Sequence, residues 1–462
     1  MTLEFAAPTE DAIPLYLITT AQLDDALNAL DDAARNWVEL HGFKGKLGQI
    51  ALVPDGEGNV SEALFGWGTA KERAKRRFAL GDFAAKAPEG VYEIQSELRK
   101  DEAEEAALGW LLSGYRYTDY KEATEQKAQL VAPENIDPNR LKVIAAGVSA
   151  ARDLINTPAN DMGPTKLEAA AKELAEAHDA EFTSIVGEEL LAQNFPMIHT
   201  VGRASADAPR LLDMRWGDED APKVTLVGKG VCFDTGGLNL KTAVGMRQMK
   251  KDMGGAANIL ALAHMIMAAG LPVRLRVLIP AVENAVAGNA FRPGDILPTR
   301  KGLTVEIGNT DAEGRLVLSD AIAYASEEEP EMMIDMATLT GAARIAMGLD
   351  IAPVFCNDDE LTADIVEGGQ LARDPVWPMP LWDPYDDDLK STHADIDNAP
   401  PGGVGGAITA ALFLRRFVGE GISWAHFDIM AWNNTTKPGR PKGGECVTAR
   451  ACFAMLEKRY GG

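Results

Sequence analysis

Residues 224–237 read Val-Thr-Leu-Val-Gly-Lys-Gly-Val-Cys-Phe-Asp-Thr-Gly-Gly, and this stretch indicates how the larger part of the chain folds. Val224 to Val227 is a short apolar run typical of a buried strand, and Gly228-Lys229-Gly230 follows it as a loop. A helix rich in Ala, Leu and Met is predicted over about 247–269, and an apolar strand over 273–279. This alternation is typical of a largely parallel sheet with helices on both faces.

The same pattern extends over the rest of the chain from about residue 138. It predicts strands at 303–307 and 332–336 and a helix at 316–325. Before residue 138 the sequence predicts a strand at 13–20, helical segments at 22–39, 70–79 and 98–114, and a hairpin at 48–68 whose turn contains Gly56 and Gly58. A further helical segment is predicted at 139–155. Pro133 and Pro138 mark a polar stretch between the two parts. We therefore predict a smaller N-terminal α/β domain, 1–137, and a larger catalytic α/β domain, 138–462.

Composition excludes several classes of protein. The chain has 462 residues, 46% hydrophobic and 25% charged, and no apolar run approaches the roughly 18 residues of a membrane span. A net charge of -24 makes binding to nucleic acid unfavourable. The N-terminus has no secretory pattern, and the four cysteines are scattered without metal or disulfide spacing. We expect a soluble cytoplasmic protein that does not bind membranes.

Carboxylates follow the predicted strands. Asp234 and the Asp311/Glu313 pair come after strands, and Asp252 lies early in the predicted helix. Each acid alone is more typical of a turn or a helix cap. Four acids at neighbouring strand ends would repel one another unless cations compensate, and two divalent ions supply the matching charge. In an extended segment Asp311, Glu313 and Arg315 would share one face, although a solvated salt-bridge loop is the alternative.

Two close divalent ions are typical of hydrolases, because they activate a water and polarise a carbonyl. Lys241 lies between the acidic segments and could donate to a developing oxyanion, or it could simply be an exposed lysine. The sequence contains neither a HExxH zinc motif nor a GxxxxGK[ST] phosphate loop.

Several motifs together resemble the leucyl aminopeptidases of the M17 type, over residues from about 145 to the C-terminus. The resemblance rests on Asn309-Thr-Asp-Ala-Glu-Gly-Arg-Leu316, the 227–237 segment with Lys241, Met249-Lys-Lys-Asp-Met253, Arg152-Asp-Leu-Ile-Asn-Thr-Pro158, Gly288-Asn-Ala-Phe-Arg-Pro-Gly-Asp295 and Ala407-Ile-Thr-Ala-Ala-Leu-Phe-Leu414. It implies an exopeptidase that removes the N-terminal residue of peptides. It also implies manganese or zinc, a water bridging two ions as the nucleophile, and a homo-hexamer.

The resemblance assigns roles to individual residues. Lys229, as a neutral amine, would hold one ion with Asp234 and Asp252, Asp311 would bind the other ion, and Asp234 and Glu313 would bridge the two. Lys241 would be the electrophilic catalytic residue, and Arg315 would hold a bicarbonate general base. The substrate's N-terminal residue would lie in a pocket lined by Met249, Thr338, Leu339 and Gly341.

Two segments depart from the family pattern. Relatives usually read Asp-Ile-Ala-Gly where this chain has Asp428-Ile-Met430-Ala-Trp432, so Met430 is expected to reshape the pocket and a preference for leucine is not implied. Lys437-Pro-Gly-Arg-Pro441 also differs, which is typical of a divergent bacterial branch.

Two other functions are compatible with parts of the sequence. A two-metal phosphoesterase or non-peptide amidohydrolase would use the same carboxylates and ignore the substrate's α-amine. DNA binding, known among bacterial relatives, would use a basic helical run. That run consists of Lys71, Arg73, Lys75, Arg76 and Arg77, and a solvated helix face is its simpler interpretation.

Overall fold

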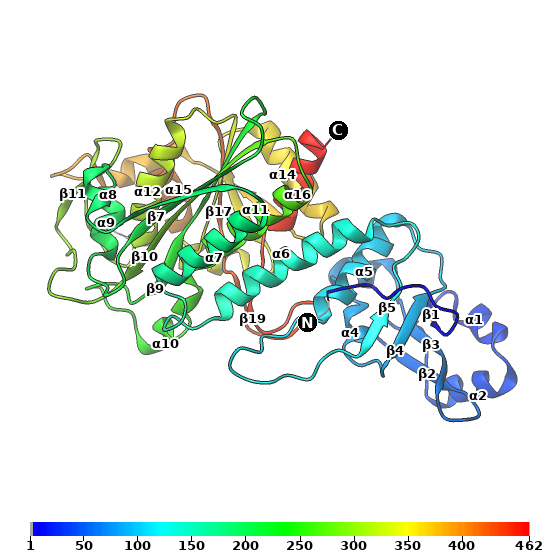
Figure 1. Ribbon diagram of the computed structural model, residues 1–462. Helices are drawn as coiled ribbons and strands as arrows, with labels where there is room; N and C mark the ends of the chain where they lie inside the picture. The colour runs from blue at the N-terminus through cyan, green and yellow to red at the C-terminus, as the bar shows by residue number, and fades with distance from the viewer. Residues whose placement is uncertain (1–2, 401, 462) are drawn as a thin grey trace. The chain divides into compact units, whose positions relative to one another are not determined.

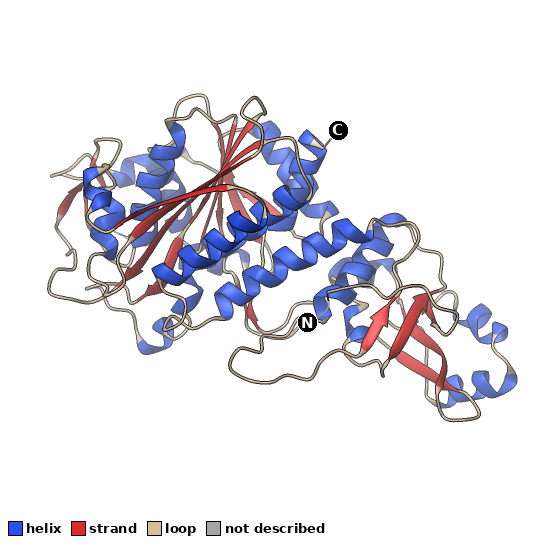
Figure 2. Cartoon of the chain, viewed as in Figure 1, coloured by secondary structure: helices blue, strands red, loops and turns tan. Residues whose placement is uncertain are grey.

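A computed structural model describes residues 3–400 and 402–461. The chain forms two compact units, one comprising residues up to 149 with 433–442, the other comprising 150–432 and the residues from 443 onward. Both units are α/β, as predicted (Figure 2). Helix α6, Pro138–Asn156, begins next to the predicted boundary at 137, and the chain passes from the first unit to the second within it.

The first unit contains a five-stranded sheet in the order β2-β3-β1-β4-β5. Its neighbours are parallel except for the β2–β3 hairpin. The predicted turn of that hairpin is confirmed, because Oδ1 of Asp55 accepts hydrogen bonds from the amides of Glu57 and Asn59, both at 2.8 Å. The strands are β1 Ile13–Ile18, β2 Ile50–Pro54, β3 Val60–Gly66, β4 Gly90–Ile94 and β5 Ala128–Leu130.

The helices of the first unit are shorter than the sequence pattern predicts. The helical pattern at 22–39 is divided in two, because the Asp31 carboxylate accepts from the amide of Ala34 at 2.8 Å and starts a new helix. The helices are α1 Leu23–Ala29, α2 Asp32–Leu40, α3 Ala70–Lys75, α4 Gly81–Ala84 and α5 Lys100–Ser113.

The basic run around α3 is partly neutralised within its own unit. Arg73 pairs with Glu102 at 2.8 Å, and Arg76 pairs with Asp82. These ion pairs reduce the charge that the run would offer to a phosphate backbone.

The second unit contains a nine-stranded mixed sheet in the order β15-β14-β17-β13-β8-β10-β7-β6, with β9 beside β10. The central strands β17, β13, β8 and β10 are parallel, and β7, β6 and β14 introduce antiparallel neighbours. The strands are β6 Glu181–Val186, β7 Arg210–Trp216, β8 Lys223–Gly228, β9 Gly230–Asp234, β10 Arg274–Asn284, β13 Met332–Ala337, β14 Ala352–Cys356, β15 Val376–Met379 and β17 Ser423–Asp428. Shorter strands are β11 Ile296–Pro298, β12 Thr304–Glu306, β16 Ile396–Asp397, β18 Trp432–Asn433 and β19 Gly443–Gly444.

Helices cover this sheet (Figure 1). Helix α11 packs on β8 and β13 and is buried almost all round, as its continuous Ala, Leu, Ile and Met content requires. Helices α9 and α12 pack on β10 and on each other. The helices are α7 Pro164–Ala177, α8 Glu189–Ala192, α9 Pro196–Gly202, α10 Ala243–Met246, η1 Met249–Met253, α11 Gly254–Ala268, α12 Glu313–Ser326, α13 Gly341–Met347, α14 Asp359–Leu371, η2 Asp383–Leu389, α15 Gly406–Arg415 and α16 Ala449–Tyr460. Among residues 3–400 and 402–461, no helix is long and apolar enough to cross a bilayer.

Candidate metal centre

The polar side chains predicted from the sequence lie at the carboxyl ends of central strands in the second unit. Lys229 joins β8 to β9, and Asp234 is the last residue of β9. Thr338 follows β13, and Glu313 is the first residue of α12. Loops at the carboxyl ends of parallel strands are where ligands of open α/β sheets bind.

Lys229 is at the centre of the cluster. Its Nζ lies 2.6 Å from Oδ2 of Asp252 and 2.9 Å from Oε1 of Glu313, and it donates to the carbonyl oxygen of Thr338 at 3.0 Å. The side chain is only 3% exposed. Lys229 therefore joins three segments that are far apart in sequence.

Lys241 joins the other two carboxylates. Its Nζ lies 2.7 Å from Oδ2 of Asp234 and 2.5 Å from Oδ1 of Asp311. Its side chain is 17% exposed, compared with 3% for Lys229, and both lysines line a cavity. Lys241 is thus the more accessible of the two ammonium groups of the cluster.

The Gly236-Gly237 pair allows the chain to turn between Asp234 and Lys241. Gly236 has a φ of +87°, and a Cβ at this position would lie 2.5 Å from the carbonyl oxygen of Asn239 and 2.9 Å from Oδ1 of Asp311. Only glycine fits this conformation without displacing the carboxylate.

The electrostatics of the cluster are unbalanced. Four carboxylates and two ammonium groups carry a formal charge of -4 + 2 = -2 in a largely buried site. Burial, together with Asp234, raises the pKa of Glu313 to about 8, and burial, together with Asp252, raises the pKa of Asp234. Both shifts mean that additional positive charge would stabilise the ionised carboxylates.

The donor set fits divalent cations. One ligand oxygen each from Asp234, Asp252 and Glu313 lies within 4.8 Å of the others, and all three residues are buried. Oε2 of Glu313 and Oδ1 of Asn284 are buried acceptors with no hydrogen-bond partner among the described residues. Buried unpaired oxygens are costly unless a cation or water pairs with them.

The groups of the cluster do not by themselves favour the neutral Lys229 amine that the family resemblance implies. Burial acts to lower the pKa of the Lys229 amine, but Asp252, Glu313 and Asp234 together outweigh burial and raise that pKa. A lowered pKa would need the positive charge of bound cations close to the amine. The neutral Lys229 ligand therefore stays a prediction for the ion-loaded protein.

The predicted extended arrangement of Asp311, Glu313 and Arg315 is wrong. Asp311 lies in a turn, whereas Glu313 and Arg315 belong to the first turn of α12. Arg315 donates to the carbonyl oxygen of Asn398 at 2.6 Å, and its buried Nε has no partner among the described residues. Burial lowers the pKa of Arg315 to about 10, so the guanidinium remains charged at neutral pH.

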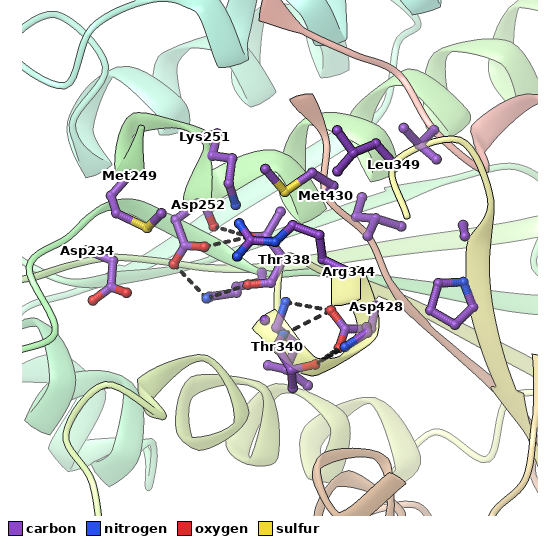
Figure 3. Close-up of a pocket in the computed structure, with 18 of the residues that line it drawn as sticks. Asp234, Met249, Lys251, Asp252, Thr338, Thr340, Arg344, Leu349, Asp428 and Met430 are labelled. Carbon is purple, nitrogen blue, oxygen red and sulfur yellow. Dashed lines mark hydrogen bonds and ion pairs between the residues drawn. The ribbon is translucent and has the colours of Figure 1, made fainter. Parts of the chain in front are cut away.

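A cavity of about 400 Å³ opens beside the cluster (Figure 3). It is lined by all four residues of the predicted substrate pocket. These residues are Met249, Thr338, Leu339 and Gly341. Met430, which departs from the family pattern, also lines it, together with Leu349 and Ile351.

Three residues of the site were not among the sequence candidates. Asn284, at the end of β10, donates to Oδ1 of Asp234 at 2.9 Å. Asp428, at the end of β17, accepts from the amides of Leu339 and Thr340 at 2.9 and 3.0 Å. The third is Lys251, a buried lysine that lines the cavity. Asn284 ends β10 and Asp428 ends β17, and a polar residue that ends an apolar strand is the signal that could have identified them.

The fold and this centre together define a metal-dependent hydrolase of the α/β class. The catalytic-domain model of the cytosol aminopeptidase family matches residues 149–453, and the M17 aminopeptidase N-terminal domain model matches residues 13–133. The chain belongs to the M17 cytosol aminopeptidase family and is a metallo-exopeptidase. This membership confirms the resemblance seen in the sequence and decides against the phosphoesterase alternative. The family match also covers residues 13–133 of the first domain, where the sequence analysis finds no family motif.

Individual relatives match along nearly the whole chain. A probable cytosol aminopeptidase of Chlorobium limicola is 34% identical and covers 95% of each chain, and a cytosol aminopeptidase of Encephalitozoon cuniculi is 35% identical over 97% of this chain and 96% of its own. The crystal structure of the Coxiella burnetii cytosol aminopeptidase is 43% identical, covers 99% of each chain and superimposes with a TM-score of 0.95. The bottromycin maturation enzyme BotP in complex with Mn is 31% identical, covers 98% of this chain and all of its own, and has a TM-score of 0.87.

Proposed function

We propose that this chain removes the N-terminal residue from peptides with the help of two divalent ions, manganese or zinc, held in the Lys229–Asp252 cluster. Lys229, Asp234 and Asp252 would hold one ion and Asp311 the other, with Asp234 and Glu313 between them. The observation that carries this proposal is the buried group of three carboxylates with an unpaired Glu313 oxygen. When bound, the ions would supply Lewis acidity and an activated bridging water for attack on the peptide carbonyl.

Manganese binding in BotP, a relative of similar fold, supports the choice of metal. All the proposed catalytic and metal-binding residues belong to the predicted catalytic domain, 138–462. A homo-hexamer and a cytoplasmic location remain predictions from the family resemblance and the sequence.

Lys241 is proposed to polarise the carbonyl of the scissile bond. Its ammonium is held between Asp234 and Asp311 and faces the cavity. These two carboxylates outweigh the effect of burial and raise the pKa of Lys241, so it stays protonated and can donate to an oxyanion.

Arg315 is proposed to hold a bicarbonate ion that acts as the general base. One of its nitrogens is committed to Asn398, which fixes the guanidinium, while the buried Nε is available to a small oxyanion. All four carboxylates of the cluster are proposed as metal ligands, and no histidine is among its proposed residues. We therefore propose that a bound bicarbonate is the general base.

Metal removal tests the proposal. The purified protein should hydrolyse aminoacyl-p-nitroanilides, lose this activity after exhaustive chelation and regain it with Mn²⁺. A substrate with an acetylated α-amine is the matched control and should not be cleaved. Activity that survives complete chelation, or equal cleavage of the acetylated substrate, would contradict the proposal.

A further inference from the structure

Lys251 is a buried lysine without a partner. It lies in η1, is 6% exposed and lines the cavity. Its amine makes no hydrogen bond and no ion pair with any residue in the ranges 3–400 and 402–461. An amine that lines a cavity and has no partner among the described residues can pair with an anionic group of a bound molecule.

Asp252 and Asp428 are the carboxylates whose charges act most strongly on Lys251, and both accept hydrogen bonds from other groups. Oδ2 of Asp252 contacts Lys229, and Oδ1 of Asp252 accepts from the hydroxyl of Thr338 at 2.7 Å. Asp428 accepts hydrogen bonds from the 339–340 loop. Neither carboxylate forms an ion pair with Lys251 among the described residues, so the Lys251 amine can take its partner from a bound molecule.

Part of the wall of the cavity that Lys251 lines is apolar, whereas the residues of the metal cluster make its other part polar. Met249, Met430, Leu349 and Ile351 line the same cavity, and Figure 3 shows the Lys251 side chain extending into the space that Met430 borders. Such a cavity can pack methylene groups and present one cation to the end of a side chain. A glutamate or aspartate side chain has this combination of apolar stem and anionic end.

We propose that Lys251 determines specificity by pairing with the side-chain carboxylate of an acidic N-terminal residue, so that peptides beginning with Glu or Asp are preferred. This rests on the proposed aminopeptidase function and goes beyond it by naming the substrate class. The exposed cation Arg344, which also lines the cavity, would add to the positive potential met by such a substrate.

Kinetics on a panel of Glu, Asp, Gln and Leu aminoacyl-p-nitroanilides tests the proposal. Lys251→Met replaces the amine by an uncharged chain of similar length, and Arg247→Met is the matched control, because Arg247 is exposed, close in sequence and outside the cavity lining. We expect wild-type protein and the control to favour Glu over Gln, and Lys251→Met to reduce kcat/KM for Glu by roughly 10- to 100-fold while Gln and Leu change little. An unchanged Glu to Gln ratio in Lys251→Met would overturn the proposal.

A binding measurement gives a readout independent of turnover. Isothermal titration of the manganese-loaded protein with L-glutamate and L-norleucine should show weaker glutamate binding in Lys251→Met, by roughly 10- to 100-fold, with norleucine nearly unchanged. Equal loss for both ligands would overturn a specificity role. If no aminoacyl substrate is cleaved, the proposed function fails, and the glutamate titration still decides the role of Lys251. If Gln and Leu are cleaved but Glu is not preferred, the function stands and this inference fails.

Discussion

Gly314→Ala should damage the metal centre while leaving the fold intact. A Cβ at Gly314 would lie 2.6 Å from Cε and 2.8 Å from Nζ of Lys229. Carbon atoms pack at about 3.5–4.0 Å, so the end of Lys229 must move by roughly 1 Å. That displacement disturbs contacts of 2.6 and 2.9 Å to Asp252 and Glu313. A misplacement of this size can cost about 100-fold in rate, which is the loss of kcat/KM that we expect.

Stability should respond much less than activity. Gly314 lies in the first turn of α12, where alanine favours the helix by up to about 1 kcal/mol and so offsets part of the steric cost. The assay is kcat/KM on leucine p-nitroanilide at saturating Mn²⁺, with bound manganese and the melting temperature measured on the same sample. Gly288→Ala is the control, because a Cβ there would meet no atom within 4 Å. Wild-type activity and manganese content in Gly314→Ala would refute the role given to Lys229.

Three further predictions follow from the same site and its surroundings. Lys241→Met should lower kcat by about 100- to 1,000-fold without unfolding the protein, measured by steady-state kinetics beside circular dichroism. Asp428→Ala removes the acceptor of the 339–340 loop and should cost about 3 kcal/mol of unfolding free energy, whereas Asp428→Asn keeps an acceptor and should cost less than half as much, measured by denaturant unfolding. Burial lowers the pKa of His264 to about 4, below its unfolded value of about 6.5. The contribution of His264 to the free energy of unfolding is therefore fully present above pH 6.5 and is lost as the pH falls toward 4. Wild-type protein should lose about 2 kcal/mol between pH 7.5 and 5 that His264→Gln does not lose, and identical pH dependence in the two would contradict this assignment.

The elements of the fold were largely predictable because they depend on local patterns. The apolar runs at 224–227 and 332–336 form β8 and β13, and the hairpin around Gly58 is present. The ends of elements were less predictable. The helix expected from 247 begins at Gly254, because Met249–Met253 form a 3₁₀ turn that carries Asp252 beside Lys229.

The site was predictable as a set of residues but not as a geometry. Asp234, Asp252 and Glu313 could be named because several acids near neighbouring strand ends would repel one another unless cations compensate, and their convergence is observed. Contacts such as Asn284 with Asp234 join residues that are 50 apart in sequence, and only the sheet register brings them together. The error at Asp311 to Arg315 has a physical cause, since Glu313 starts a helix and an extended pattern cannot apply there.

The central claim is that Lys229, Asp234, Asp252, Asp311 and Glu313 together hold two divalent ions. Anomalous scattering at the manganese edge, measured on crystals grown with Mn²⁺, tests it most directly. The account predicts two peaks, each within about 2.0–2.6 Å of ligand atoms from these five residues. A single peak among them, or manganese only elsewhere on the protein, would contradict it.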